Sequence, residues 1–79
     1  MIIQVLYDKI DKELLSVVKI LRGLKGEKEI FFSKSRKNEI IIDSYKIWEK
    51  GESKENIIEG FYDVKIYELV KGAIIGVSS

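Results

Sequence analysis

The fold is decided by residues 1–25, which read MIIQVLYDKIDKELLSVVKILRGLK. Residues 1–7 are mostly β-branched or aromatic and predict a strand, and apolar residues on both of its faces predict burial on two sides. The residues after it place apolar side chains at helical spacing. These are Ile10, Leu14, Val17, Val18, Leu21 and Leu24. Because Asp8 or Asp11 supplies an N-cap, we expect a helix over residues 8–25.

Two short apolar runs follow this helix and predict a β-hairpin. They are Glu29–Ser33 and Glu39–Asp43, and a polar, turn-like segment, residues 34–38, lies between them. The segment lacks a two-residue turn of the Asn-Gly type, so the sequence does not fix the register of the hairpin.

The second half of the chain allows two interpretations. The favoured one places a short helix at 44–50, a helix at 54–60 capped by Ser53, and a helix at 64–75 capped by Asp63. The other places a strand at 61–69 because Val64 and Ile66 alternate with Lys65. The tail, residues 72–77, is compatible with a strand in both.

These elements predict one α+β domain over residues 1–79 in the order β-α-β-β-α-α-α, with a small sheet covered by helices. The alternative order is β-α-β-β-α-β, which is ferredoxin-like. A chain of 79 residues buries a small core, and with no cysteine it has no disulfide to support it. We therefore expect a homodimer.

Composition argues against catalysis. The chain has no histidine and no cysteine, so the usual general base, nucleophile and zinc ligands are absent. Asp8 with Asp11 or Asp43 offers oxygen ligands for Mg²⁺, but nothing in the spacing of the acidic residues singles out a site. We expect a protein that is not an enzyme and that has no metal and no cofactor.

No apolar run approaches the length of a membrane span, and the N-terminus does not have the pattern of a signal peptide. We therefore expect a cytoplasmic protein with no membrane contact. Heavy use of lysine and glutamate is typical of hyperthermophile proteins, and an AT-rich genome produces the same bias, so both origins stay open.

Charge is distributed unevenly along the chain. Residues 19–37 carry a net charge of +5 and residues 38–63 a net charge of −4, although the whole chain is at +1. The basic side chains gather at the end of the first helix and at the expected hairpin tip, where Ser33, Ser35 and Asn38 add polar groups. The candidate phosphate contacts are Arg22, Lys25, Lys34, Arg36, Lys37 and, on the last helix, Lys65; a solvated loop whose lysines protect a sheet edge is the alternative.

Residues 51–71 have the pattern of a helix-turn-helix. Ser53 caps a helix with Ile57 and Ile58, a tight turn follows around Gly60 to Asp63, and a second amphipathic helix presents Lys65 and Tyr67. Over about residues 40–75 the chain resembles a family of small prokaryotic domains of unknown function that are often found in toxin–antitoxin operons. The resemblance is carried by Gly51-Glu-Ser53, the Ile-rich helix and residues 66–70. It implies an antitoxin-like regulator that binds DNA.

Two hypotheses for function follow. The first is a regulatory protein that binds double-stranded DNA through the basic hairpin and the helix-turn-helix. The second is a protein-interaction module whose acidic helical half receives a basic partner protein. For the second, Trp48, Tyr45 and Tyr62 are candidate contacts, since tryptophan and tyrosine dominate binding hot spots; core packing is the alternative for these aromatic residues.

Overall fold

A computed structural model describes the backbone of residues 1–78 and the side chains of residues 1–71. Over these residues the chain forms four strands and two helices in the order β-α-β-β-β-α. The elements are β1 (Ile2–Tyr7), α1 (Lys12–Gly23), β2 (Glu29–Lys34), β3 (Glu39–Ile42), β4 (Tyr45–Glu49) and α2 (Glu55–Ser78). The molecule is an α+β domain, as the sequence predicts.

The four strands form one mixed sheet in the order β2-β1-β3-β4. β1 pairs with β2 in parallel, because α1 carries the chain back to the starting edge of the sheet. β1 pairs with β3 in antiparallel fashion, and β3 continues into β4. β2 and β4 are therefore the edge strands.

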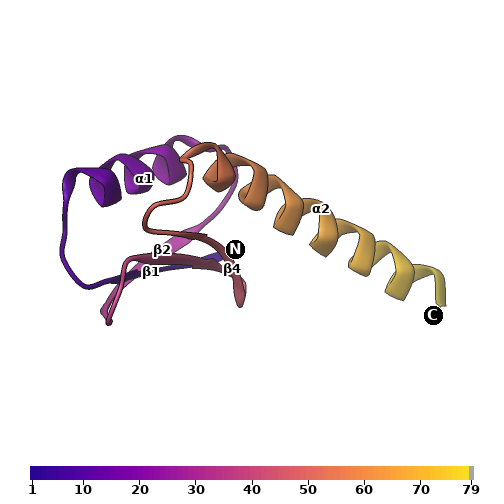
Figure 1. Ribbon diagram of the computed structural model, residues 1–79. Coiled ribbons are helices and arrows are strands. Elements are labelled where there is room, and N and C mark those ends of the chain that lie inside the picture. Colours follow the sequence, from indigo (N-terminus) through magenta and orange to yellow (C-terminus); the bar gives the residue numbers. More distant parts are fainter. Residues whose placement is uncertain (79) are drawn as a thin grey trace.

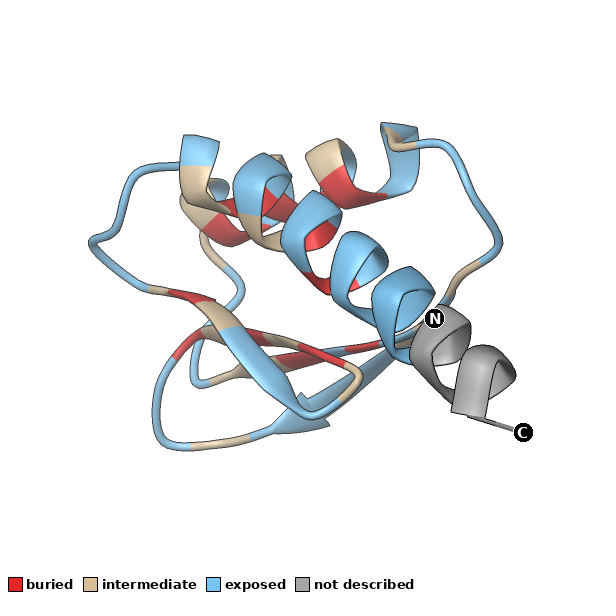
Figure 2. Cartoon of the chain, turned by 90° about the vertical axis from the view of Figure 1, so that its right-hand side faces the viewer, coloured by how far each residue is buried: buried red, intermediate tan, exposed pale blue. Residues whose placement is uncertain are grey.

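Both helices cover the same face of this sheet (Figure 1). The core lies between the two layers (Figure 2). It takes Ile3 and Val5 from β1 and Ile40, Ile42 and Trp48 from the β3–β4 hairpin; α1 adds Leu14, Val17, Val18 and Leu21, and α2 adds Ile57, Phe61 and Val64. Four of the six side chains predicted on the buried face of the first helix are thus confirmed as buried. Asp11 is the N-cap, and its carboxylate accepts a hydrogen bond from the Leu14 N–H at 2.8 Å.

The opposite face of the sheet lacks a covering layer among the described residues. Ile2 and Gln4 of β1 are exposed there, next to Phe31 of β2. The expectation that the first strand is buried on both faces is therefore wrong. It is central in the sheet, but of its residues only Ile3 and Val5 are fully buried, and Tyr7 packs partly buried against the same core.

The expected hairpin of residues 29–43 is also wrong. β1 lies between β2 and β3, so residues 35–38 are a connection that passes the end of β1. Asn38 fixes this connection: its Oδ1 accepts a hydrogen bond from the Asp8 N–H at 2.7 Å and its Nδ2 donates one to the Lys9 carbonyl at 2.9 Å. Asn38 is 2% exposed, so it is a structural residue and not a phosphate contact.

The second half differs most from both sequence interpretations. Residues 45–49 form a strand where a helix was expected, because Asp43 and Ser44 adopt the positive φ angles of a two-residue hairpin turn. The expected helices 54–60 and 64–75 are one continuous helix, so the predicted turn at Gly60–Asp63 and the helix-turn-helix are absent. The alternative strands at 61–69 and 72–77 lie within the same helix, which excludes the ferredoxin-like order. Ser53 is confirmed as the cap, since its Oγ accepts a hydrogen bond from the Glu55 N–H at 3.2 Å.

α2 is longer than the sheet is wide. Its first half packs on the sheet, and its second half projects beyond the domain (Figure 1). The molecule is consequently elongated, measuring 46 × 21 × 20 Å.

Candidate functional site: a groove between β4 and α2

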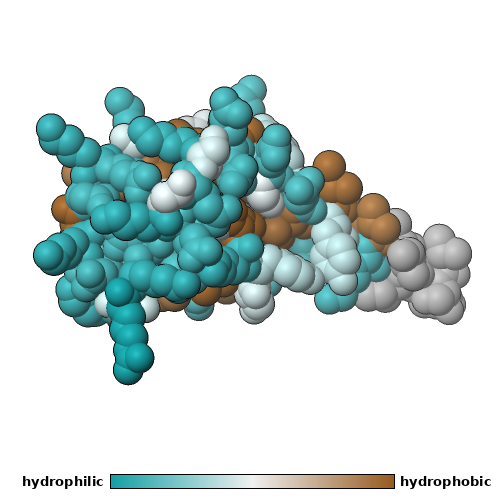
Figure 3. Space-filling model, viewed as in Figure 1, coloured by the Kyte–Doolittle hydropathy of each residue, from teal (hydrophilic) through white to brown (hydrophobic). Residues whose placement is uncertain are grey.

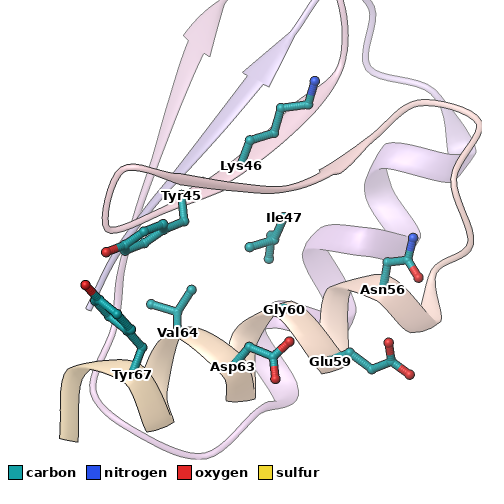
Figure 4. A pocket seen from close by; sticks show the side chains of 9 residues that line it. All are labelled: Tyr45, Lys46, Ile47, Asn56, Glu59, Gly60, Asp63, Val64 and Tyr67. Atoms are coloured by element: carbon teal, nitrogen blue, oxygen red, sulfur yellow. The ribbon is translucent and has the colours of Figure 1, made fainter. Parts of the chain in front are cut away.

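A groove of about 470 Å³ runs between the edge strand β4 and the flank of α2. Figure 4 shows its lining from close by. Residues 45–47 of β4 form one wall, and α2 forms the other with Asn56, Glu59, Gly60, Asp63, Val64 and Tyr67. From Asn56 to Tyr67 the helix rises about 16 Å at 1.5 Å per residue. This length matches about five residues of an extended chain.

A β-bulge shapes the β4 wall. Ile40 pairs with Trp48 and Ile41 pairs with Lys46, so Ile47 is an extra residue with no partner on β3. Its side chain points toward α2 (Figure 4). The bulge thereby lets Trp48 enter the core while Ile47 fills the base of the groove.

Gly60 lets α2 approach this strand closely. A Cβ atom at position 60 would lie 2.6 Å from the Ile47 Cβ, which is closer than carbon atoms pack. This close contact requires a glycine at position 60. Glycine in the middle of a helix is otherwise unfavourable by about 0.5–1 kcal/mol relative to alanine. The contact with Ile47 sets the width of the groove.

Two tyrosines close one end of the groove. The rings of Tyr45 and Tyr67 meet edge to face, with centroids 5.6 Å apart, and their hydroxyls point toward one another (Figure 4). A hydrogen bond between the hydroxyls raises the pKa of Tyr45 above its usual value, and burial adds to this effect. Tyr45 therefore offers a neutral hydroxyl group near neutral pH, and the two residues together offer apolar ring edges.

The α2 wall carries the charge of the groove. Glu59 and Asp63 are exposed on it, and neither forms an ion pair with another side chain of residues 1–71. Lys46 on the opposite wall directs its ammonium away from α2 (Figure 4), where it lies 3.3 Å from carboxylate oxygens of Glu39 and Glu49. These two carboxylates raise the pKa of Lys46, that of Glu49 having the larger effect. The groove consequently presents unneutralised negative charge beside an edge strand.

The basic residues predicted to contact DNA lie at two opposite ends of the sheet. Arg22 lies in the last turn of α1 and Lys25 follows that helix, near the start of β1 and β2. The Lys65 ammonium lies 3.7 Å from the Cβ position of Gly26 in the same region. Lys34, Arg36 and Lys37 lie at the other end of β1, in and beside the connection to β3. A strand of six residues separates the two groups by about 20 Å.

Acidic groups of the protein already engage two of these lysines. Lys37 lies 2.9 Å from a carboxylate oxygen of Glu49, and this ion pair lowers the pKa of Glu49. Lys34 donates to the Asp8 carbonyl, lies 4.0 Å from the Asp8 carboxylate and covers the Tyr7 ring. With the helix-turn-helix absent, DNA binding stays a prediction that rests on the charge of these basic residues alone.

The three aromatic residues predicted to contact a partner lie in three different places. Trp48 is fully buried and donates a hydrogen bond from Nε1 to the Glu52 carbonyl at 3.2 Å, so it stabilises the core. Tyr45 lines the groove. Tyr62 is exposed on α2 and packs edge to face on Phe61. Core packing, the alternative, therefore holds for Trp48, and the three side chains do not form one contact surface.

The sequence does not predict that Glu59, Asp63, Ile47 and Tyr67 line one groove. The excess of acid over residues 38–63 was the signal for the first two, but it did not place them beside an edge strand. Ile47 and Tyr67 gave no signal, because their proximity depends on the bulge and on an unbroken α2.

Comparison of the chain with family models, curated proteins and solved structures finds no match to any of them. No helix in the described part of the chain is long and apolar enough to cross a membrane. Within the same residues, no group of three or more acidic side chains is placed to hold a metal ion.

Proposed function

We propose that this protein is a protein-interaction module that receives an extended, basic segment of a partner in the groove between β4 and α2. The observation that carries the proposal is the combination of an edge strand on one wall with two unpaired carboxylates, Glu59 and Asp63, on the other. Strand addition beside a helix is a recurrent way of binding extended peptides, because the free backbone groups of the edge supply affinity and side-chain pockets supply specificity.

Each part of the groove has a role in this binding. The free edge at residues 45–47 pairs with the backbone of the incoming segment. Alternate side chains of that segment point toward α2, where basic ones meet Glu59 and Asp63. The Tyr45–Tyr67 pair closes the end and offers ring edges to an apolar residue.

Binding to labelled peptides tests the proposal. The probe is a fluorescent six-residue peptide of alternating lysine and valine, and the matched control peptide alternates glutamate and valine. We expect fluorescence anisotropy to show saturable binding of the basic peptide only, with affinity that falls as salt is added. The variant Glu59→Lys/Asp63→Lys should weaken binding at least about tenfold, which corresponds to about 1.4 kcal/mol.

A charge control separates the groove from the net charge of the chain. Glu27→Lys changes one exposed acid in the loop between α1 and β2, outside the groove lining. It should leave the affinity within about twofold of the original, which is the usual effect of a distant surface charge. Equal loss of affinity in Glu27→Lys and Asp63→Lys would show that attraction is non-specific. Tighter binding of duplex DNA than of the basic peptide would favour the regulatory hypothesis instead.

A further inference from the structure

The edge of β4 carries hydrogen bonds that limit what can bind to it. Apolar atoms are also exposed along the upper edge of the projecting part of α2 (Figure 3), but the described residues around them do not indicate a partner. At the β4 edge, in contrast, the direction of each backbone group and its bonds within the chain define where a bound strand can pair.

Lys46 is the first residue of β4 whose backbone faces the free edge. The Asp43 N–H donates to the Ile2 carbonyl of β1 at 2.9 Å, so the backbone of the preceding residue, Ile42, faces β4. Ile42 pairs with Tyr45. Because successive residues of a strand alternate in direction, the N–H and C=O of Lys46 turn away from β3.

Glu49 also faces this edge, because the Lys50 N–H donates to the Asn38 carbonyl at 2.9 Å and the residue before it must turn the other way. The groups of Glu49 are bonded within the chain. Its N–H donates to the Glu52 Oε1 at 3.0 Å, and its carbonyl accepts from the Glu52 N–H at 3.0 Å. Glu52 thus gives Glu49 the acceptor and the donor that the opposite residue of an added antiparallel strand would give it.

Two further hydrogen bonds hold Glu52 in this position. The Asn56 Nδ2 donates to the Glu52 Oε2 at 3.0 Å, and the Trp48 Nε1 donates to the Glu52 carbonyl at 3.2 Å. Covering a sheet edge with a loop is a common protection against strand addition. The cover ends before Lys46, since no side chain of residues 1–71 bonds to the backbone of that residue.

Given the proposed function, we infer that Glu52 fixes the register of the bound segment. The segment adds antiparallel to β4, and one of its residues exchanges two hydrogen bonds with Lys46. Pairing ends at Glu49, where Glu52 takes the place of the partner. The residue opposite Lys46 points to the open face of the sheet, as Lys46 does, so its two neighbours point toward Glu59 and Asp63. The segment therefore carries a basic residue on each side of the anchoring one.

Two peptides of equal charge test this register. The first is the six-residue peptide of alternating lysine and valine. The second adds four residues of alternating threonine and valine at its N-terminus. An antiparallel segment runs from Glu49 toward Tyr45, so this extension reaches past Glu49. In the original chain, fluorescence anisotropy should show an affinity changed by less than about twofold, because Glu52 leaves the extension no free donor.

Two variants of Glu52 separate its hydrogen bond from its charge. Glu52→Ala frees the Glu49 N–H, so the extended peptide should bind at least about fivefold more tightly than the six-residue one, which is the effect of about one hydrogen bond. Glu52→Gln loses the charge but keeps an oxygen acceptor, and it should behave as the original chain does. Amide hydrogen exchange measures the cap without any peptide: the Glu49 amide should exchange at least about tenfold faster in Glu52→Ala than in Glu52→Gln.

The outcomes distinguish this inference from the proposed function. If the six-residue peptide binds all three chains, an absent gain in Glu52→Ala or an equal gain in Glu52→Gln would overturn the inference alone. A gain in Glu52→Ala when the extension is placed at the C-terminus would also overturn it, because the segment would then be parallel to β4. Equal exchange of the Glu49 amide in both variants would show that Glu52 does not cap the edge. A peptide that binds none of the three chains would contradict the proposed function as well.

Discussion

Asn38 shows how one side chain holds the fold at the residue scale. Its amide both accepts from the Asp8 N–H and donates to the Lys9 carbonyl while fully enclosed. Asn38→Asp keeps the acceptor but replaces the donor with an oxygen that faces the Lys9 carbonyl. We expect a loss of about 1–3 kcal/mol in the free energy of unfolding, measured with urea. The control Gln4→Glu makes the same chemical change on the exposed face of the sheet and should alter stability by less than about 0.5 kcal/mol.

Asp11 links the helix cap to the acid stability of the protein. The Leu14 N–H and then the Lys50 ammonium, 3.1 Å away, lower the pKa of Asp11 below its usual value. The unfolded chain therefore binds a proton at a higher pH than the folded one does. This stabilisation is complete above the unfolded pKa of about 3.9 and is lost as the pH falls through the folded pKa.

Urea unfolding at a series of pH values between 7 and 2 checks the role of Asp11. Asp11→Asn should show a smaller loss of stability on acidification than the original chain. Lys50→Met keeps the cap hydrogen bond and should show an intermediate loss. A residual loss is expected in both, because the lowered pKa of Glu49 acts in the same direction. An unchanged pH dependence in Asp11→Asn would contradict the assignment.

At the scale of the element, Gly60 decides how α2 meets the sheet. Gly60→Ala improves helix propensity but places a Cβ on Ile47, so we expect a loss of about 1–3 kcal/mol in stability. Gly23→Ala is the matched control, since a Cβ at position 23 of α1 has open space and should stabilise by about 0.5–1 kcal/mol. Thermal and urea unfolding measure both. Equal effects of the two substitutions would contradict a close contact between α2 and β4.

Local sequence patterns correctly predicted the regular helix and strands. They gave wrong predictions where the structure depends on contacts between residues that are distant in sequence. The helix ending near Gly23 and the strands at 29–34 and 39–42 follow from periodicity. The strand at 45–49 did not, because the bulge places Ile47 and Trp48 in succession and breaks the alternation that marks a strand. Gly60 led to the prediction of a turn, but this glycine lies within α2 and leaves room for the side chain of Ile47. The prediction of a hairpin over residues 29–43 was wrong because no local sequence pattern shows that β1 lies between β2 and β3.

At the scale of the whole molecule, the groove and the basic residues at the end of β1 lie apart and should act independently. Asp63→Lys should weaken binding of the basic peptide, whereas Arg36→Gln should leave the affinity within about twofold, since effects of separated sites add. Fluorescence anisotropy on the two variants checks this. The sequence predicted an acidic half of the chain, but only the packing of α2 against β4 shows which of its acids lie beside an edge strand.

The most direct test of the groove is an NMR titration of the ¹⁵N-labelled full chain with the peptide of alternating lysine and valine. The account predicts that the amide shifts concentrate on residues 45–47 and on the side of α2 that carries Gly60 and Asp63, with contacts between the peptide backbone and the β4 edge. Shifts confined to the exposed side of α2 at Ile58 and Tyr62, to the open face of the sheet or to residues 34–37 would contradict it.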